Sequence, residues 1–100
     1  MIYNLSAPTK GPNYGIEDHV HVDEDDFNLI VNSGPWTLYV KNGKRSAIRW
    51  EGRKMVHMHR LIMAAGPRDY VYHTDGNGLN NRRMNLSASR VMQDALGLFG

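Results

Sequence analysis

The chain has 100 residues, of which 41% are apolar, a formal net charge of +2 and no cysteine. A chain of this length buries only about 65% of its unfolded surface, so we expect one small domain and exclude a second one. The absence of cysteine excludes disulfides and cysteine-bound zinc, so metal ligands are expected to be histidine or carboxylate groups, which favours a Mg²⁺-like ion.

The hydropathy pattern favours neither a membrane nor an exported protein. No run of 18 apolar residues occurs, and the first residues lack the basic flank and long apolar stretch of a signal peptide. We therefore expect no membrane partner and a cytoplasmic location, which is the host cytoplasm if the chain is viral.

The charges are divided unevenly along the chain. Residues 1–40 hold one lysine against six carboxylates, a net charge of −5, whereas residues 41–100 hold eleven Lys and Arg against four carboxylates, a net charge of +7. A phosphate-binding face would produce such an asymmetry, and an ordinary solvated surface is the alternative.

The first third of the chain predicts an arm, a strand and a helix. Residues 1–15 show no periodicity and contain several Pro and Gly, which indicates an extended or loosely attached arm. Val20 and Val22 alternate with histidines and indicate a short strand. Acidic residues 23–26 then open a short helix whose apolar positions recur at i, i+3 and i+4, and Gly34-Pro35 ends it.

The middle of the chain predicts an antiparallel meander. The β-rich runs 36–40 and 46–50 flank Asn42-Gly43, a dipeptide typical of tight hairpin turns. A second turn at Glu51-Gly52 leads to a third strand over residues 54–56.

The last part of the chain predicts a helix, a strand, a loop and a second helix. Apolar residues between 58 and 65 have helical spacing, and Gly66-Pro67 closes that helix. Residues 70–73 form a strand, the Gly- and Asn-rich segment that follows is an ordered loop, and residues 87–98 are expected to be helical, with Ser87 or Ser89 as the cap.

Two segments together resemble a known family. Residues 58–62 read M-H-R-L-I, and residues 71–86 read V-Y-H-T-D-G-N-G-L-N-N-R-R-M-N-L, with Asn85 twelve places after His73. This order of elements and motifs is similar to the small HNH endonucleases of phages and mobile introns, from about residue 20 to residue 94. The resemblance implies an α+β fold in which an N-terminal antiparallel β-meander with a short helix precedes a ββα-metal core at about residues 57–98, within a single domain over residues 16–100.

The resemblance also implies roles for individual residues. His73 would be the general base that takes a proton from the attacking water, and Asn85 would hold it or its strand in position. His59, in the M-H-R segment, and Asn81 would support these groups by hydrogen bonding. Without the flanking motif, a structural histidine would be the simpler interpretation of His73.

The metal ligands are where the chain departs from the family. Many relatives carry Asp directly before the base, whereas this chain has Tyr72, a neutral phenol with poor affinity for hard divalent ions. The second family ligand, twenty-one residues after the base, falls on Asp94, so His73 and Asp94 are the expected ligands of Mg²⁺ or Mn²⁺. Asp75 is an alternative ligand, although Asp in this context more often forms a turn.

Seven basic residues are candidate DNA contacts. Arg82 and Arg83 lie beside the expected base, where guanidinium groups can bind phosphate oxygens in a bidentate manner. A two-stranded ribbon can also enter a major groove. The basic residues on the predicted hairpin are Lys44, Arg45, Arg49, Arg53 and Lys54.

The sequence therefore predicts a metal-dependent HNH-type DNA endonuclease or nicking enzyme encoded by a phage or mobile element. The alternative is a catalytically inactive HNH-fold protein that binds DNA or inhibits a host defence complex, with a protein as its partner. Tyr72 favours this alternative. The sequence leaves open whether the protein forms a homodimer.

Overall fold

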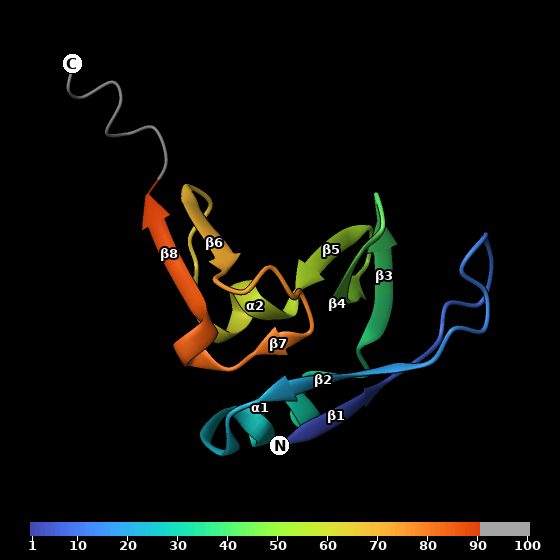
Figure 1. The fold of residues 1–100 in the computed structure, drawn as a ribbon, viewed down its shortest axis with the longest axis horizontal. Coiled ribbons are helices and arrows are strands. Elements are labelled where there is room, and N and C mark those ends of the chain that lie inside the picture. The colour runs from blue at the N-terminus through green and yellow to red at the C-terminus, as the bar shows by residue number, and fades with distance from the viewer. Residues whose placement is uncertain (91–100) are drawn as a thin grey trace.

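The computed structural model describes residues 1–90 and shows a mixed α+β fold, which confirms the predicted class (Figure 1). In that range no helix is long and apolar enough to cross a membrane. The strands are arranged in three small sheets, of order β1-β2-β7, β3-β4-β5 and β6-β8.

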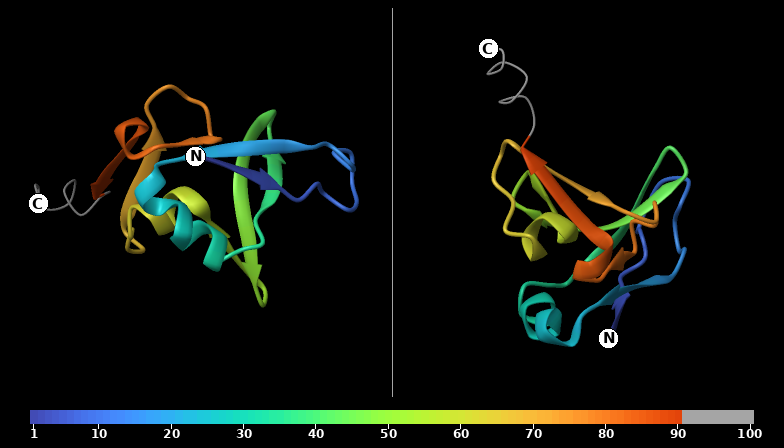
Figure 2. Two further views of the ribbon diagram at one scale, coloured as in Figure 1. Left: turned by 90° about the horizontal axis from the view of Figure 1, so that it is seen from below. Right: turned by 60° about the vertical axis from the view of Figure 1, so that its left-hand side comes forward.

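The first sheet contains the amino end of the chain. Strand β1 (Ile2–Leu5) pairs antiparallel with β2 (Asp18–Val22), and β2 pairs in parallel with the short β7 (Asn80–Asn81). Figure 2 shows β1 and β2 side by side, with the connecting residues at the far end of the pair. Of the two alternatives for the arm, residues 2–5 are extended, and the loosely attached alternative is wrong for them, because ladder hydrogen bonds and the burial of Leu5 fix them.

Helix α1 (Glu24–Asn32) follows β2 with three acidic residues in its first turn, as predicted. The indole Nε1 of Trp36 donates a hydrogen bond of 2.9 Å to the carbonyl of Ile30, and both side chains are fully buried. This bond fixes the chain after α1 and directs it into the second sheet.

The predicted meander is present. It consists of β3 (Thr37–Lys41), β4 (Lys44–Glu51) and β5 (Lys54–His57), all antiparallel. Asn42 and Gly43 both have positive φ angles, of 54° and 77°, as a tight two-residue hairpin turn requires.

The third sheet differs from the prediction. Helix α2 (Met58–Ile62) precedes β6 (Asp69–His73), which pairs antiparallel with β8 (Leu86–Arg90) after a 3₁₀ turn, η1 (Arg83–Asn85). A helix beginning at Ser87 is therefore wrong for residues 87–90, because Ser87 and Ser89 lie opposite Tyr72 and Tyr70 in the ladder. The remainder of that predicted helix lies outside the described residues.

One cluster of buried apolar residues joins the three sheets and both helices. Helix α2 contributes Met58 and Ile62, and β6 and β8 contribute Val71 and Leu86. The hairpin β6-β8 is thus packed onto the same core as the meander. The other buried members are Leu5, Val20, Val22, Ile30, Trp36, Leu38, Ala47 and Leu79.

Candidate functional site

A groove of about 580 Å³ lies between the β3-β4 hairpin and strand β6. Its lining includes three histidines, His57, His59 and His73, and the basic side chains Lys41, Lys44 and Arg45. No carboxylate is among the described residues that line it. The structure therefore brings the expected base together with part of the predicted basic hairpin, in a groove whose described side chains with a full charge are all basic.

His73 stands at the end of β6, and its ring is fixed from one side. Nε2 of His73 lies 2.7 Å from Oδ1 of Asn81, which is fully buried in β7. An amide oxygen can only accept a hydrogen bond, so in the tautomer that forms this contact Nε2 carries the ring proton and Nδ1 carries the lone pair. Nδ1 is therefore the atom of His73 that can accept a proton or bind a cation.

His59 packs against His73 through the edge of its ring, with the two ring centroids 4.8 Å apart. Burial, together with the neighbouring charges of His73, His57 and Arg60, lowers the pKa of His59 from 6.5 to about 3. Burial also lowers the pKa of His57. Both are thus neutral at physiological pH, and His59 supports His73 by ring contact rather than by the hydrogen bond that the sequence suggested.

The M-H-R-L-I segment has a structural explanation. Met58 and Ile62 are core residues, His59 contacts His73, and Arg60 donates to the carbonyls of Gly66 and Asp69 at 2.6 and 2.7 Å. Arg60 thereby fixes the loop that leads into β6. This helix positions the histidine and the strand that carries it.

Asn85 fastens the loop that follows His73. Its Oδ1 accepts a hydrogen bond from the Asp75 amide at 3.0 Å, and its Nδ2 donates to the Asp75 carboxylate and the Asn80 carbonyl. The Asn85 carbonyl also accepts from the Thr74 amide at 2.8 Å. Asn85 thus fixes the loop next to His73 through these hydrogen bonds.

Asp75 serves as a loop acceptor in the structure. Three hydrogen bonds lower the pKa of Asp75 to about 2. The bond from the Asn77 amide has the largest effect, followed by those from the Asn80 and Asn85 side chains. Because its two oxygens are engaged in this way, Asp75 acts as a turn former in the structure.

The described residues do not by themselves fit a divalent cation. Within residues 1–90 no three His, Asp or Glu side chains are grouped so that they could hold a metal ion. Asp94, the predicted carboxylate ligand, lies outside the described residues. His73 is therefore the one expected ligand whose position is known.

Arg82 and Arg83 have different environments although they are adjacent in sequence. Nε and Nη2 of Arg83 each donate to the Asp26 carboxylate at 2.9 Å, and Nη2 also reaches the Ile62 carbonyl. Since Asp26 is only 4% exposed, Arg83 neutralises a buried charge. Its guanidinium group is bound to α1 and is therefore not available for phosphate. Arg82 is exposed, near Nδ1 of His21 at 3.2 Å, and is the better candidate for a phosphate contact.

The basic residues of the predicted ribbon separate into two groups. Lys44 and Arg45 line the groove at the start of β4. Arg53 and Lys54 are exposed beyond the other end of β4, and the length of the strand places them roughly 20 Å away. The remaining one, Arg49, is partly buried: its guanidinium lies 5.8 Å from the centroid of the fully buried Trp36 ring, and its Nη2 lies 3.8 Å from the Glu51 carboxylate. It is therefore a weaker candidate for a DNA contact than Lys44.

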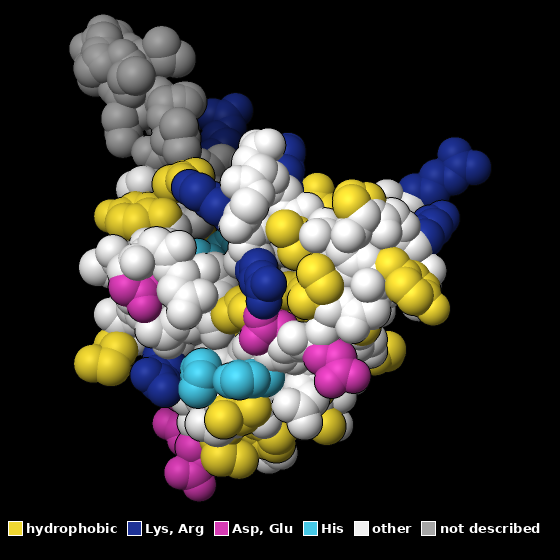
Figure 3. Space-filling model, turned by 45° about the vertical axis from the view of Figure 1, so that its right-hand side comes forward, with side chains coloured by type: hydrophobic (Ala, Val, Ile, Leu, Met, Phe, Trp, Pro, Cys, Tyr) yellow, Lys and Arg dark blue, Asp and Glu magenta, His cyan; other side chains and the backbone are white. Residues whose placement is uncertain are grey.

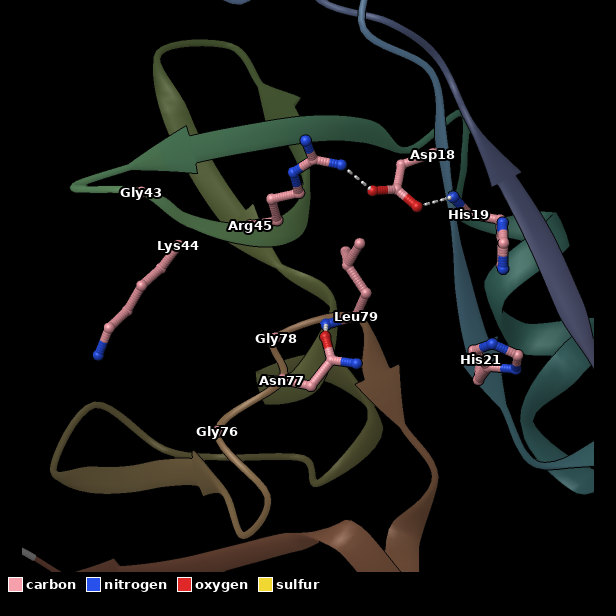
Figure 4. Close-up of a pocket in the computed structure, with 10 residues that line it drawn as sticks. All are labelled: Asp18, His19, His21, Gly43, Lys44, Arg45, Gly76, Asn77, Gly78 and Leu79. Atoms are coloured by element: carbon pink, nitrogen blue, oxygen red, sulfur yellow. Dashed lines mark hydrogen bonds and ion pairs between the residues drawn. The ribbon is translucent and has the colours of Figure 1, made fainter.

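A second hollow of about 410 Å³ lies beside the groove and shares Lys44, Arg45 and the loop glycines with it (Figure 4). Here Arg45 is paired with Asp18, and His19 and His21 pack edge to face at 5.2 Å. Figure 3 shows two histidine side chains next to each other with acidic and basic groups around them. The hollow therefore presents mixed charges, unlike the groove.

Several functional features were not identified from the sequence. Tyr70 and Lys41 line the groove, and Gly78 packs so closely on β4 that a Cβ there would overlap the carbonyl of Arg45. A signal existed for Tyr70, because Y-x-Y in a strand places both rings on one face. No sequence signal indicated the contact between Gly78 and β4, which joins residues far apart in the chain.

No protein-family model matches this chain, and no curated protein or solved structure was found to match it either.

Proposed function

We propose that this chain is an HNH-type DNA endonuclease or nicking enzyme, in which His73 is the general base. The observation that carries the proposal is the fixed imidazole of His73 in a groove lined by basic side chains, with Nε2 held by Asn81 and the next residues held by Asn85. The antiparallel pair β6-β8, with the Asn-rich loop between its strands, supports the proposal, because the family resemblance implies two strands in a ββα-metal core.

The proposed chemistry follows from these residues. Nδ1 of His73 accepts a proton from a water molecule, whose oxygen attacks the phosphorus of a phosphodiester. The bond between phosphorus and the 3′ oxygen then breaks, and the 3′ oxygen takes a proton from solvent. Asn81 keeps the ring in the required tautomer, and the neutral His59 adds no charge that would oppose protonation of His73. Arg82 and Lys44 attract the DNA phosphates.

The family resemblance implies Mg²⁺ or Mn²⁺ bound by His73 and Asp94. Since Nε2 of His73 is engaged by Asn81, Nδ1 would either bind such an ion or accept the proton, and the mechanism above assigns it the proton. Such an ion, when bound, would stabilise negative charge on the phosphate and on the leaving oxygen. None of the steps above depends on it, because the described residues alone do not form its site.

The test is nicking of supercoiled plasmid with Mg²⁺, with Mn²⁺ and with a chelator. We expect His73→Ala to lower the nicking rate at least about 100-fold while DNA affinity stays within about twofold, because a general base contributes roughly 10²–10⁴ to the rate. His19→Ala, in the neighbouring hollow, is the matched control and should keep the parental rate. Unchanged nicking by His73→Ala would contradict the mechanism.

A second candidate function is a DNA-binding protein without catalysis. The observation that favours it is Tyr72, which occupies the position of the family carboxylate and stacks on Tyr70. An inactive parent combined with nicking by Tyr72→Asp would support this second function. Nicking by the parent would support the first.

A further inference from the structure

Strand β6 presents two tyrosine rings to solvent. The rings of Tyr70 and Tyr72 stack with their centroids 5.7 Å apart and an interplanar angle of 24°. They remain 56% and 42% exposed. Tyrosine is enriched at interfaces, because its ring contributes apolar contact area while its hydroxyl stays hydrogen-bonded, so an exposed pair is a candidate contact site.

The neighbouring strand leaves these rings open. In the ladder, Tyr70 lies opposite Ser89 and Tyr72 lies opposite Ser87, so β8 contributes only small side chains beside the rings. Among the described residues, β6 has no other strand partner than β8. A flat ligand could therefore reach the face of a tyrosine without displacing a bulky residue of β8.

The charge of the groove identifies the kind of ligand. Both tyrosines line the same groove as Lys41, Lys44 and Arg45, and no carboxylate is among its described lining residues. Arg45 is paired with Asp18 in the neighbouring hollow, so Lys41 and Lys44 supply most of the positive charge of the groove. A cationic groove with stacked aromatic rings is the combination that binds single-stranded nucleic acid, because the phosphates meet the cations and each base has a π-face that can stack. The volume of about 580 Å³ is in the range of sites that hold a small molecule, roughly 300–1,000 Å³, which is large enough for a single nucleotide.

We propose that Tyr70 and Tyr72 stack an unpaired base of a DNA strand whose phosphates lie toward Lys44 and Arg45. The protein then prefers single-stranded or locally unpaired DNA to a regular duplex, whose bases are already stacked and paired. This inference rests on the proposed function in that the ligand is DNA, but it does not require cleavage.

The test is fluorescence anisotropy with a labelled 12-nucleotide DNA, the same sequence as a duplex, and that duplex with a single-base bulge. The chelator is present, so that nicking is suppressed if it requires a divalent ion. We expect the single strand and the bulged duplex to bind at least fivefold more tightly than the regular duplex. The double variant Tyr70→Leu/Tyr72→Leu should weaken binding of the single strand at least about tenfold, since stacking contributes about 1–3 kcal/mol per base.

Two variants separate stacking from other effects. Tyr70→Phe/Tyr72→Phe keeps both rings and should retain the parental affinity. Tyr14→Leu removes a tyrosine that is 70% exposed and outside the groove, and it should also have no effect. Circular dichroism of each variant verifies that it is folded.

The outcomes distinguish this inference from the proposed function. Equal affinity for single strand and duplex, or a folded leucine variant that binds as tightly as the parent, would overturn the stacking site even if the protein nicks plasmid. A protein that prefers the single strand and loses this preference with the leucine variant, but never nicks DNA, would support the stacking site and refute the nuclease.

Discussion

The groove and the neighbouring hollow share Lys44, Arg45 and the glycines of the loop, yet they differ in charge. In the hollow, Asp18 pairs with Arg45, so the arginine is neutralised on that side. In the groove, the histidines are partly buried and no described carboxylate is present. The number of basic residues in a region therefore does not locate a phosphate-binding site. Acidic neighbours determine which basic side chains remain available for a phosphate.

The largest effect is expected at Gly78, which lines both the groove and the hollow. Gly78→Ala would place a methyl group against the backbone carbonyl of Arg45, so either the loop or β4 must move. We expect a loss of about 3 kcal/mol in the free energy of unfolding, measured by urea denaturation, because backbone cannot relax as a side chain can.

Gly66→Ala is the matched control for this change. Its added Cβ would lie at an ordinary contact distance of 3.5 Å from Asp69, so its effect should stay below about 1 kcal/mol. If the two variants lose the same free energy of unfolding, the close contact between Gly78 and β4 does not contribute more to stability than an ordinary loop position.

The buried histidines of the groove predict a dependence of stability on pH. The pKa of His59 is lowered from 6.5 to about 3, so between these values the unfolded chain binds a proton that the folded chain does not. The free energy of unfolding should therefore fall as the pH falls from 7 to 5, by up to about 2 kcal/mol from His59 alone, and His57 acts in the same direction.

His59→Phe should flatten this pH dependence, whereas Leu61→Phe, a neutral change in the same helix, should keep it. The measurement is urea denaturation at pH 7, 6 and 5, above the range in which carboxylates titrate. If His59→Phe and the parent have the same slope, the desolvation of His59 is not the cause.

The smallest effect concerns the ion pair of the hollow. Partial burial raises the pKa of Asp18, but hydrogen bonds from the His19 amide and Arg45, with the charge of Arg45, outweigh this and lower it. Asp18→Asn should release Arg45 and strengthen DNA binding about two- to fivefold in an anisotropy titration, while stability changes by less than about 1 kcal/mol.

Glu51→Gln makes the same charge change at the other end of β4 and is the matched control. If both variants strengthen binding equally, the gain reflects net charge and not the release of Arg45.

The local patterns of the sequence were enough for most elements, because turns and periodicity depend on neighbouring residues. The Asn42-Gly43 hairpin, the acidic start of α1 and the strand that ends at His73 all follow from local chemistry. The loop glycines and asparagines likewise predicted an ordered loop. By contrast, serines 87 and 89 suggested a helix cap, and the ladder with β6 overrode that local preference.

Only the tertiary structure decided which charged and aromatic groups meet. The sequence by itself determined the α+β class and singled out His73, Asn81 and Asn85, because their types and spacing belong to one continuous loop. Long-range packing decided that Arg83 neutralises Asp26, that Arg49 covers Trp36, and that Tyr70 faces the same groove as Lys44. The physical reason is that burial and charge pairing depend on which segments are neighbours in space, and a one-dimensional pattern does not contain that distance.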